Sequence, residues 1–307
     1  MEIKLEIKYL KHNQIVKQKW DSTIENAKNG LVYALSWYLD IVSPNWDALV
    51  VGDYEIVMPL TFKTKYGIKY LYQPVFTQHL GIFSIEEITV KQVESFVNKI
   101  AENYKFVDIQ LNSANPVLNN KFFELRDTQI VDISKLYNEI FSNYSKSLKI
   151  NLQKVFDSEL IINSIGNSSD FIKLMRKMFD TKKVDGICLN DYKNLEKIIN
   201  TSYNKNLGQF YFGYLNEELC AAAFFLKWNN RTILFTALNG KGREVGAMFG
   251  IIDRYILENA GRNLILDFAG SNITGVKYRN LGFGAKNITY YAFKLNNLPI
   301  PFKWYKS

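Results

Sequence analysis

The chain has 307 residues, of which 47% are hydrophobic and 15% aromatic, enough for one large domain or two of ordinary size. No apolar run approaches the ~20 residues that a membrane-spanning helix needs, and the first residues carry no apolar signal segment, so we expect a cytoplasmic protein. Two cysteines, Cys188 and Cys220, and two histidines lack the spacing of metal ligands, so we expect neither disulfides nor a bound metal.

The net charge of +8 is unevenly distributed along the chain. Residues 1–150 carry 17 basic and 17 acidic side chains, whereas residues 151–307 carry 21 and 13, so the whole excess lies in the C-terminal half. A one-sided positive field favours a polyanionic partner, such as a cofactor phosphate, tRNA or an acidic surface. The alternative is ordinary solubilising charge.

The N-terminal half alternates helical and strand-like patterns. A helical pattern, two strands, an amphipathic helix and two further strands are expected over 21–42, 46–53, 54–67, 88–104, 106–112 and 122–134. The first two strands meet at a turn at Gly52-Asp53.

The C-terminal half has a similar order, and a basic linker or helix over 144–155 precedes it. Two amphipathic helices, three strands, a helix and two strands are expected over 170–182, 191–205, 209–216, 218–228, 231–239, 247–261, 263–268 and 287–295. Asp170 and Asp191 are the expected N-caps of the first two helices. Asn216 and Asn229 begin tight turns that require a left-handed backbone, which asparagine tolerates.

Three glycines lie between a strand and a helix in GKGREVGAM, residues 240–248. Glycine lets the backbone approach a ligand closely, and the first amides of a helix have no internal partner and attract phosphate oxygens. The candidate phosphate-binding residues are Lys241, Gly242, Arg243, Gly246 and Ala247. The alternative is a purely structural turn.

This order of strands, glycine loop and helix resembles the acyl-CoA-binding segment of GNAT-fold acyltransferases, whose pattern is Q/R-x-x-G-x-G/A. When the pattern starts at Lys241, Gly246 matches its last position and Glu244 replaces its first glycine. When it starts at Arg243, Gly246 matches the first glycine and Met248 takes the last position. The resemblance implies that acyl-CoA, such as acetyl-CoA, binds here, although Glu244 would place a carboxylate beside its phosphates.

Residues 267–287, DFAGSNITGVKYRNLGFGAKN, resemble the C-terminal segment of the FemABX-like family, whose members contain two GNAT-like domains in one chain. Residues 144–155 resemble the entry to the second domain of those proteins. The resemblance covers about 144–307 and is weak over the first 140 residues. It implies an α/β fold with mixed sheets, of the acyl-CoA N-acyltransferase type, in two tandem GNAT-like domains over 1–143 and 144–307.

The resemblance also assigns candidate catalytic groups. Tyr278 occupies the tyrosine position of the pattern Y-x-x-x-G-F, where that side chain protonates the departing CoA thiolate. Asp267, at the end of a predicted strand, is our candidate for the base that deprotonates the amine. A backbone N–H near Ala237 and Leu238 would stabilise the tetrahedral oxyanion.

Ser271 and Lys277 complete the candidate ligand-binding residues of this segment, with Ser271 also able to cap the following helix. Each candidate has a structural alternative. Asp267 could cap a loop or pair with Arg279, Tyr278 could be a packing residue, and Lys277 with Arg279 could form a solvated helix face.

Three functions remain open at this point. The first is an N-acyltransferase that moves an acyl group from a CoA thioester directly to an amine. The second is an aminoacyl transferase that uses aminoacyl-tRNA and acts on a cell-wall precursor. The third is a non-catalytic GNAT-like pair that binds a ligand. No Ser/His/Asp or Cys/His set is recognisable, so no covalent enzyme intermediate is expected.

Overall fold

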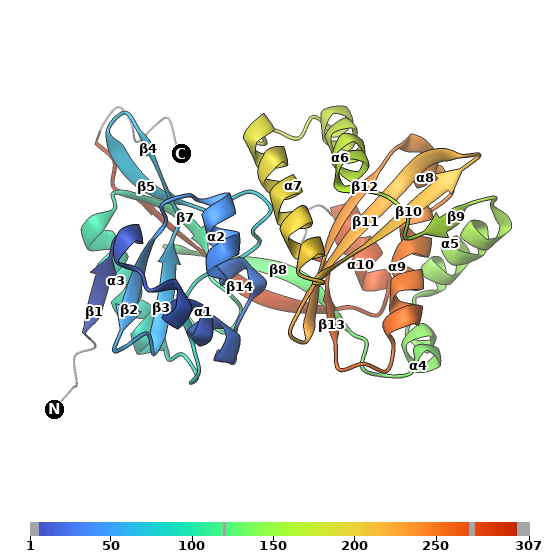
Figure 1. Cartoon of the computed structure of the whole chain (residues 1–307). Coiled ribbons are helices and arrows are strands. Elements are labelled where there is room, and N and C mark those ends of the chain that lie inside the picture. The colour runs from blue at the N-terminus through green and yellow to red at the C-terminus, as the bar shows by residue number, and fades with distance from the viewer. Residues whose placement is uncertain (1–5, 119–120, 270–273, 300–307) are drawn as a thin grey trace. The chain divides into compact units, whose positions relative to one another are not determined.

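A computed structural model of the chain describes residues 6–118, 121–269 and 274–299. The chain forms two compact units, which are unit 1, Met1–Arg126 with Thr289–Ser307, and unit 2, Asp127–Ile288. Strands β8 (Phe123–Asp132) and β14 (Lys286–Asn296) each contribute residues to both units (Figure 1).

Unit 1 combines two groups of strands with short helices. Its remaining elements are β1 (Ile7–Leu10), η1 (His12–Gln14), α1 (Lys17–Asn26), η2 (Val32–Ala34), α2 (Ser36–Val42), β2 (Asp47–Val51), β3 (Ile56–Leu60), β4 (Phe62–Lys65), β5 (Ile68–Tyr72), β6 (Phe83–Ser84), α3 (Val90–Asn103) and β7 (Phe106–Gln110). Strands β1, β2, β3 and β6 pair antiparallel in that order. Strand β5 pairs antiparallel with β4 and parallel with β7, and β7 pairs antiparallel with β14.

The amphipathic helix expected over 88–104 is confirmed as α3. Thr89 caps it by accepting a hydrogen bond from the Gln92 N–H, and its buried face carries Val93, Phe96 and Ile100. This face packs into the main apolar cluster of unit 1, so helical periodicity alone located both the element and its core side.

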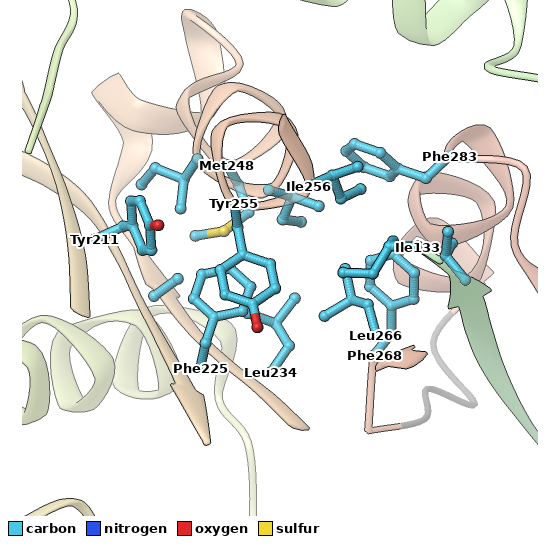
Figure 2. Packing of buried hydrophobic residues seen from close by; sticks show 14 of the residues in the cluster. Ile133, Tyr211, Phe225, Leu234, Met248, Tyr255, Ile256, Leu266, Phe268 and Phe283 are labelled. Atoms are coloured by element: carbon cyan, nitrogen blue, oxygen red, sulfur yellow. The ribbon is translucent and has the colours of Figure 1, made fainter. Parts of the chain in front are cut away.

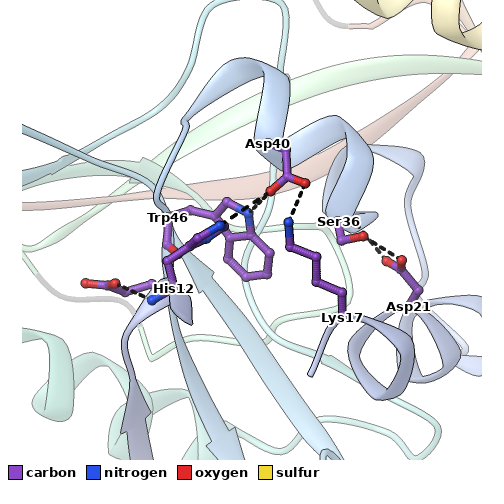
Figure 3. A network of polar contacts seen from close by, with 7 residues as sticks. His12, Lys17, Asp21, Ser36, Asp40 and Trp46 are labelled. Atoms are coloured by element: carbon purple, nitrogen blue, oxygen red, sulfur yellow. Dashed lines mark hydrogen bonds and ion pairs between the residues drawn. The ribbon is translucent and has the colours of Figure 1, made fainter. Parts of the chain in front are cut away.

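The single helical pattern over 21–42 is divided in the structure into α1, η2 and α2. The Asp21 carboxylate, on α1, accepts hydrogen bonds from the Ser36 N–H at 2.7 Å and the Ser36 hydroxyl at 2.6 Å. Nearby, Asp40 of α2 accepts from the Trp46 indole N–H at 3.0 Å and from the Lys17 ammonium at 2.7 Å (Figure 3). These carboxylates hold two short helices together where one long helix was expected.

Unit 2 is built on one mixed sheet. Its remaining elements are α4 (Tyr137–Ser142), α5 (Lys146–Asp157), β9 (Ile161–Asn163), α6 (Ser168–Lys182), α7 (Leu189–Asn204), β10 (Gly208–Leu215), β11 (Glu218–Trp228), β12 (Arg231–Leu238), α8 (Gly240–Glu244), α9 (Ala247–Asn259), β13 (Ile265–Asp267) and α10 (Thr274–Gly282). Strands β9 to β12 are antiparallel neighbours, β13 joins β12 in parallel, and β8 joins β13 antiparallel.

Both faces of the unit 2 sheet are apolar, and helices cover both. On one face Phe225 stacks on Tyr255 of α9, with ring centroids 3.7 Å apart, inside the cluster drawn in Figure 2. On the other face Phe210 packs against Phe171 of α6 and against Phe224. Because successive strand residues point to opposite faces, the near-continuous apolar runs of β10 to β12 predict this two-sided burial.

The hairpin turns of this sheet are confirmed, but the expected helix caps are wrong. Asn216 and Asn229 have φ angles of 48° and 52°, which is the left-handed backbone expected at those turns. Helix α6 begins two residues before Asp170 and is capped by Asn167, and α7 begins two residues before Asp191. Both aspartates therefore lie within the first turn, where their charge favours the helix dipole.

The chain passes between the units at residues 126 and 288, whereas the sequence placed a single boundary between 143 and 144. The second half of β14 pairs with β7 and so completes the sheet of unit 1. The second half of β8 pairs with β13 in unit 2. Apolar alternation predicts that such a segment is a strand but carries no information on which sheet edge it joins.

None of the helices in the described residues is both long and apolar enough to cross a lipid bilayer.

Candidate functional site

Strands β12 and β13 diverge at the centre of unit 2. Their parallel pairing extends only from Arg231 opposite Ile265 to Ile233 opposite Asp267, whereas β12 continues to Leu238 in register with β11. The sheet is therefore split between β12 and β13 beyond Asp267. A split of this kind exposes backbone groups of the longer strand on one side.

The backbone N–H and C=O groups of Leu238 point to the side of β12 on which β13 pairs only with residues 231–233. The Ile265 N–H donates to the Asn230 carbonyl, and the Asn239 N–H donates to the Cys220 carbonyl of β11. Because neighbouring strand residues alternate in direction, even-numbered residues of β12 face β13 and odd-numbered residues face β11. Of the two predicted oxyanion residues, Leu238 thus faces the split, and Ala237 faces β11.

The predicted glycine loop forms the short helix α8. Its N-cap, Asn239, accepts a hydrogen bond from the Gly242 N–H at 2.9 Å. A Cβ atom on Gly242 would lie 2.3 Å from the Cys220 carbonyl oxygen, so only glycine allows α8 to pack on β11. Lys241 forms an ion pair with exposed Glu218, which raises the pKa of Lys241. Close packing on β11 and the hydrogen bond to Asn239 thus explain why position 242 is a glycine. The Lys241 side chain is engaged in an ion pair with Glu218.

Gly246 lies directly before α9 with a φ angle of +74°. A side chain there would be strained, and its Cβ would lie 3.3 Å from the Phe249 ring. Helix α9 begins at buried Ala247, and in its first turn the Phe249 N–H donates to the Gly246 carbonyl at 2.9 Å. Arg243, exposed at the end of α8, is three residues away.

Asp267 is buried at the end of β13 and is held by three donors. Its carboxylate accepts from the Arg231 guanidinium at 2.6 Å, the Ala269 N–H at 2.9 Å and the Thr128 hydroxyl at 3.2 Å. The sequence offered Arg279 as a structural partner, and the structure provides Arg231 instead. A buried carboxylate with three hydrogen-bond donors has little direct access to an amine.

Helix α10 presents three consecutive residues with different surroundings. Lys277 forms an ion pair with Asp127 at 2.6 Å. Tyr278 is 68% exposed, so its hydroxyl is accessible to a ligand. Arg279 is half-buried and donates from Nε and Nη2 to the Asn280 side-chain oxygen at 3.1 and 2.8 Å. The remaining candidate of this segment, Ser271, lies outside the described residues.

Arg279 and Lys182 are the residues that sequence reasoning did not place in the site. Partial burial and the nearby positive charges of Arg243 and Arg279 lower the pKa of Lys182, the last residue of α6. Burial also lowers the pKa of Arg279 to about 10, which leaves it charged at neutral pH. The basic excess of the C-terminal half was the available sequence signal, but it does not identify individual residues.

Among the described residues, no three His, Cys, Asp or Glu side chains are grouped closely enough to hold a metal ion.

Comparison with known proteins gives matches at the level of structure. No family model and no curated protein matches the sequence. The crystal structure of FemX matches with a TM-score of 0.62 and 13% identity, over 95% of this chain and 98% of that chain. The C-terminal domain of a putative lysylphosphatidylglycerol synthetase from Agrobacterium fabrum matches with a TM-score of 0.55 and 8% identity, over 94% of both chains.

A tandem GNAT protein from the clavulanic acid biosynthesis pathway, solved without acetyl-CoA, matches with a TM-score of 0.50 and 8% identity, over 96% of this chain and 99% of that chain. Sequence identities this low do not allow an activity to be transferred to this chain. The structural similarity establishes the fold. The chain is similar over nearly its whole length to FemX and to this tandem GNAT protein, and it shares their mixed α/β fold.

Proposed function

We propose that the protein is an N-acyltransferase that moves an acyl group from a CoA thioester to an amine at the split between β12 and β13. The observation that carries this proposal is the early end of the β12–β13 pairing, which leaves Leu238 facing an open strand edge. The N-terminus of α9 and Arg243 follow directly in the chain and suit the phosphates of the donor.

The proposed reaction is a direct attack of the amine nitrogen on the thioester carbonyl carbon. A C–N bond forms, the C–S bond breaks, and the Leu238 N–H stabilises the negative charge on the carbonyl oxygen. Tyr278 donates its proton to the departing thiolate. Because Asp267 is buried and paired with Arg231, we assign the removal of the amine proton to water and a structural role to Asp267.

The first experiment tests whether the protein binds an acyl-CoA donor. Saturating acetyl-CoA or a longer acyl-CoA, at ~100 times its dissociation constant, should stabilise the fold by about 2.7 kcal/mol, which is measurable as a rise in Tm. Release of free CoA thiol in the presence of amines then tests transfer. No thermal shift with any acyl-CoA would contradict the proposal.

The role of Tyr278 is tested by Tyr278→Phe, with Tyr203→Phe on α7 as the matched control. Both tyrosines are more than half exposed, so neither change should affect folding. We expect Tyr278→Phe to lower kcat by about 10²–10⁴-fold with little change in KM, as for loss of a general acid. Equal activity of both variants would rule out Tyr278 as the acid.

The basic excess of residues 151–307 favours one further candidate, an aminoacyl transferase with an aminoacyl-tRNA donor. Binding of a tRNA that weakens steeply with salt, in the absence of acyl-CoA binding, would support it. Failure of both donors to bind would leave a non-catalytic GNAT-like pair.

A further inference from the structure

Helix α10 carries Tyr278 but is not held in place by an apolar stripe. Of its nine residues, all of which the structure describes, the buried one is Asn280, which is polar. A surface helix is usually fixed by apolar side chains spaced three and four residues apart along one face. The orientation of α10 therefore depends to a large extent on polar contacts.

Two side-chain contacts connect α10 to strand β8. The Lys277 ammonium donates to the Asp127 carboxylate at 2.6 Å, and the Asn280 amide donates to the Gln129 side-chain oxygen at 3.1 Å. Asp127 and Gln129 lie on one face of β8, because alternate strand residues point to the same side. Lys277 and Asn280, three residues apart, lie on one face of α10. Two links at different positions along the helix thus fix its rotation about its own axis.

The link through Asn280 belongs to a buried network of amides. Asn280 and Gln129 are both 0% exposed. The Asn280 oxygen accepts from the Arg279 guanidinium at 2.8 Å, and the Gln129 side-chain N–H donates to the Asn287 oxygen on β14 at 3.1 Å. Each side-chain N and O atom of Asn280 and Gln129 therefore has a partner. A buried network that is satisfied in this way rigidifies its surroundings and specifies a single arrangement.

Tyr278 lies between the two anchored residues of α10. At about 100° of rotation per residue, its side chain leaves the helix about 100° from Lys277 and about 160° from Asn280. This direction, away from β8, agrees with its 68% exposure. Because the tyrosine side chain extends far from the helix axis, a rotation of α10 displaces its hydroxyl more than any backbone atom.

We propose that Asp127 and Gln129 are positioning residues for the transfer reaction, and that they hold α10 in the rotation that brings the Tyr278 hydroxyl to the departing thiolate. This inference rests on the transferase function proposed above. A general acid must lie within hydrogen-bond reach of the group that it protonates. A misplacement of about 1 Å can lower the rate by about 100-fold.

The main test compares Asp127→Asn with Glu124→Gln. Both changes neutralise a partly exposed carboxylate on β8, but Glu124 pairs with Arg126 and Lys294, whereas Asp127 pairs with α10. We expect Asp127→Asn to lower kcat by about 10- to 100-fold with little change in KM. Glu124→Gln should change kcat by less than about 3-fold. Asp127→Glu retains a carboxylate and should recover most of the activity.

A double-mutant cycle tests whether Asp127 acts through Tyr278. If it does, Asp127→Asn should lower kcat by less than about 3-fold in the Tyr278→Phe background, because the acid is already absent there. An undiminished loss in that background would overturn the positioning role. Gln129→Met removes both side-chain hydrogen bonds of the buried amide and provides a second variant, whose effect on kcat should depend on Tyr278 in the same way.

Hydrogen exchange of the α10 amides tests the anchoring without a transfer assay. Exchange over residues 274–282 should be faster in Asp127→Asn than in the wild-type protein and unchanged in Glu124→Gln. Unchanged exchange in Asp127→Asn would overturn the inference, whatever the transfer assay shows, and would leave the proposed function intact. Faster exchange together with no transfer by the wild-type protein would refute the proposed function and, with it, the role of these residues in catalysis.

Discussion

The two units differ in the partners that surround some of their buried charged side chains. In unit 1 the buried carboxylate of Asp47 is compensated by a cation, because Lys69 donates to it together with the Tyr9 hydroxyl and the His12 N–H. In unit 2 Arg231 compensates the buried Asp267 in the same way. Unit 2 differs in two other charges, because Arg279 is held by a neutral amide, and Asp253 of α9 accepts hydrogen bonds only from the hydroxyls of Tyr137 and Tyr144 among the described residues.

This difference separates charges that build the fold from charges that are available to a ligand. A buried charge that is paired helps to fix the position of the groups around it, and removing its partner costs several kcal/mol in the free energy of unfolding. A charge with neutral partners is kept at a cost to stability, which is common at sites where function requires it. The overall balance agrees, since residues 1–150 are neutral and the +8 excess lies in residues 151–307.

The largest effect should follow loss of the central carboxylate of unit 1. Asp47→Ala leaves Lys69, Tyr9 and the His12 N–H without their shared acceptor, and we expect a loss of about 3–5 kcal/mol in the free energy of unfolding. Urea denaturation measures this change. Asp53→Ala, which removes an exposed partner of Lys19, is the control and should cost about 0.5 kcal/mol or less.

Asp267→Asn should have the next largest effect and decides between two roles of this residue. The amide retains the shape of the carboxylate but loses the charge opposite Arg231, so we expect a loss of about 2–3 kcal/mol in stability. Asp127→Asn, at the partly exposed pair with Lys277, should cost less than about 1 kcal/mol. Unchanged stability together with a large fall in kcat would instead identify Asp267 as the catalytic base.

Much of the fold was predictable because it depends on local patterns. The apolar spacing of α3 encodes the face that is buried, and the near-continuous apolar runs of β10 to β12 encode burial of both faces of those strands. The left-handed turn at Asn229 was predictable for the same reason, since one residue type suits one backbone conformation. The partner of β14 was not predictable, because pairing with β7 depends on a contact between residues far apart in the sequence.

The candidate site was harder to predict, because its residue types have several uses. Gly242 fits a phosphate loop by sequence, yet in the structure it allows a close approach to Cys220. Lys277 and Arg279 are equivalent as sequence, and only the position of Asp127 distinguishes a paired cation from an available one. Such distinctions depend on tertiary partners, which an isolated sequence does not show.

The smallest effect concerns pH and Asp253. Burial raises the pKa of Asp253 above its ordinary value of 3.8, and the hydrogen bonds from Tyr137 and Tyr144 only partly oppose this. A carboxyl whose folded pKa is raised contributes stability below its unfolded pKa and loses that contribution as pH rises through the folded pKa. The wild-type protein should therefore lose more stability than Asp253→Asn as pH rises above about 3.8.

Urea denaturation of both proteins between about pH 3.5 and 7 measures this difference, and Asp132→Asn provides a control of opposite sign. Hydrogen bonds from Ser134 lower the pKa of Asp132, so its contribution to stability is present above the unfolded pKa and is lost as pH falls. If Asp253→Asn and Asp132→Asn shift the pH dependence in the same direction, the tyrosine hydroxyls compensate Asp253 as fully as Lys69 compensates Asp47, and the contrast between the units does not hold for carboxylates.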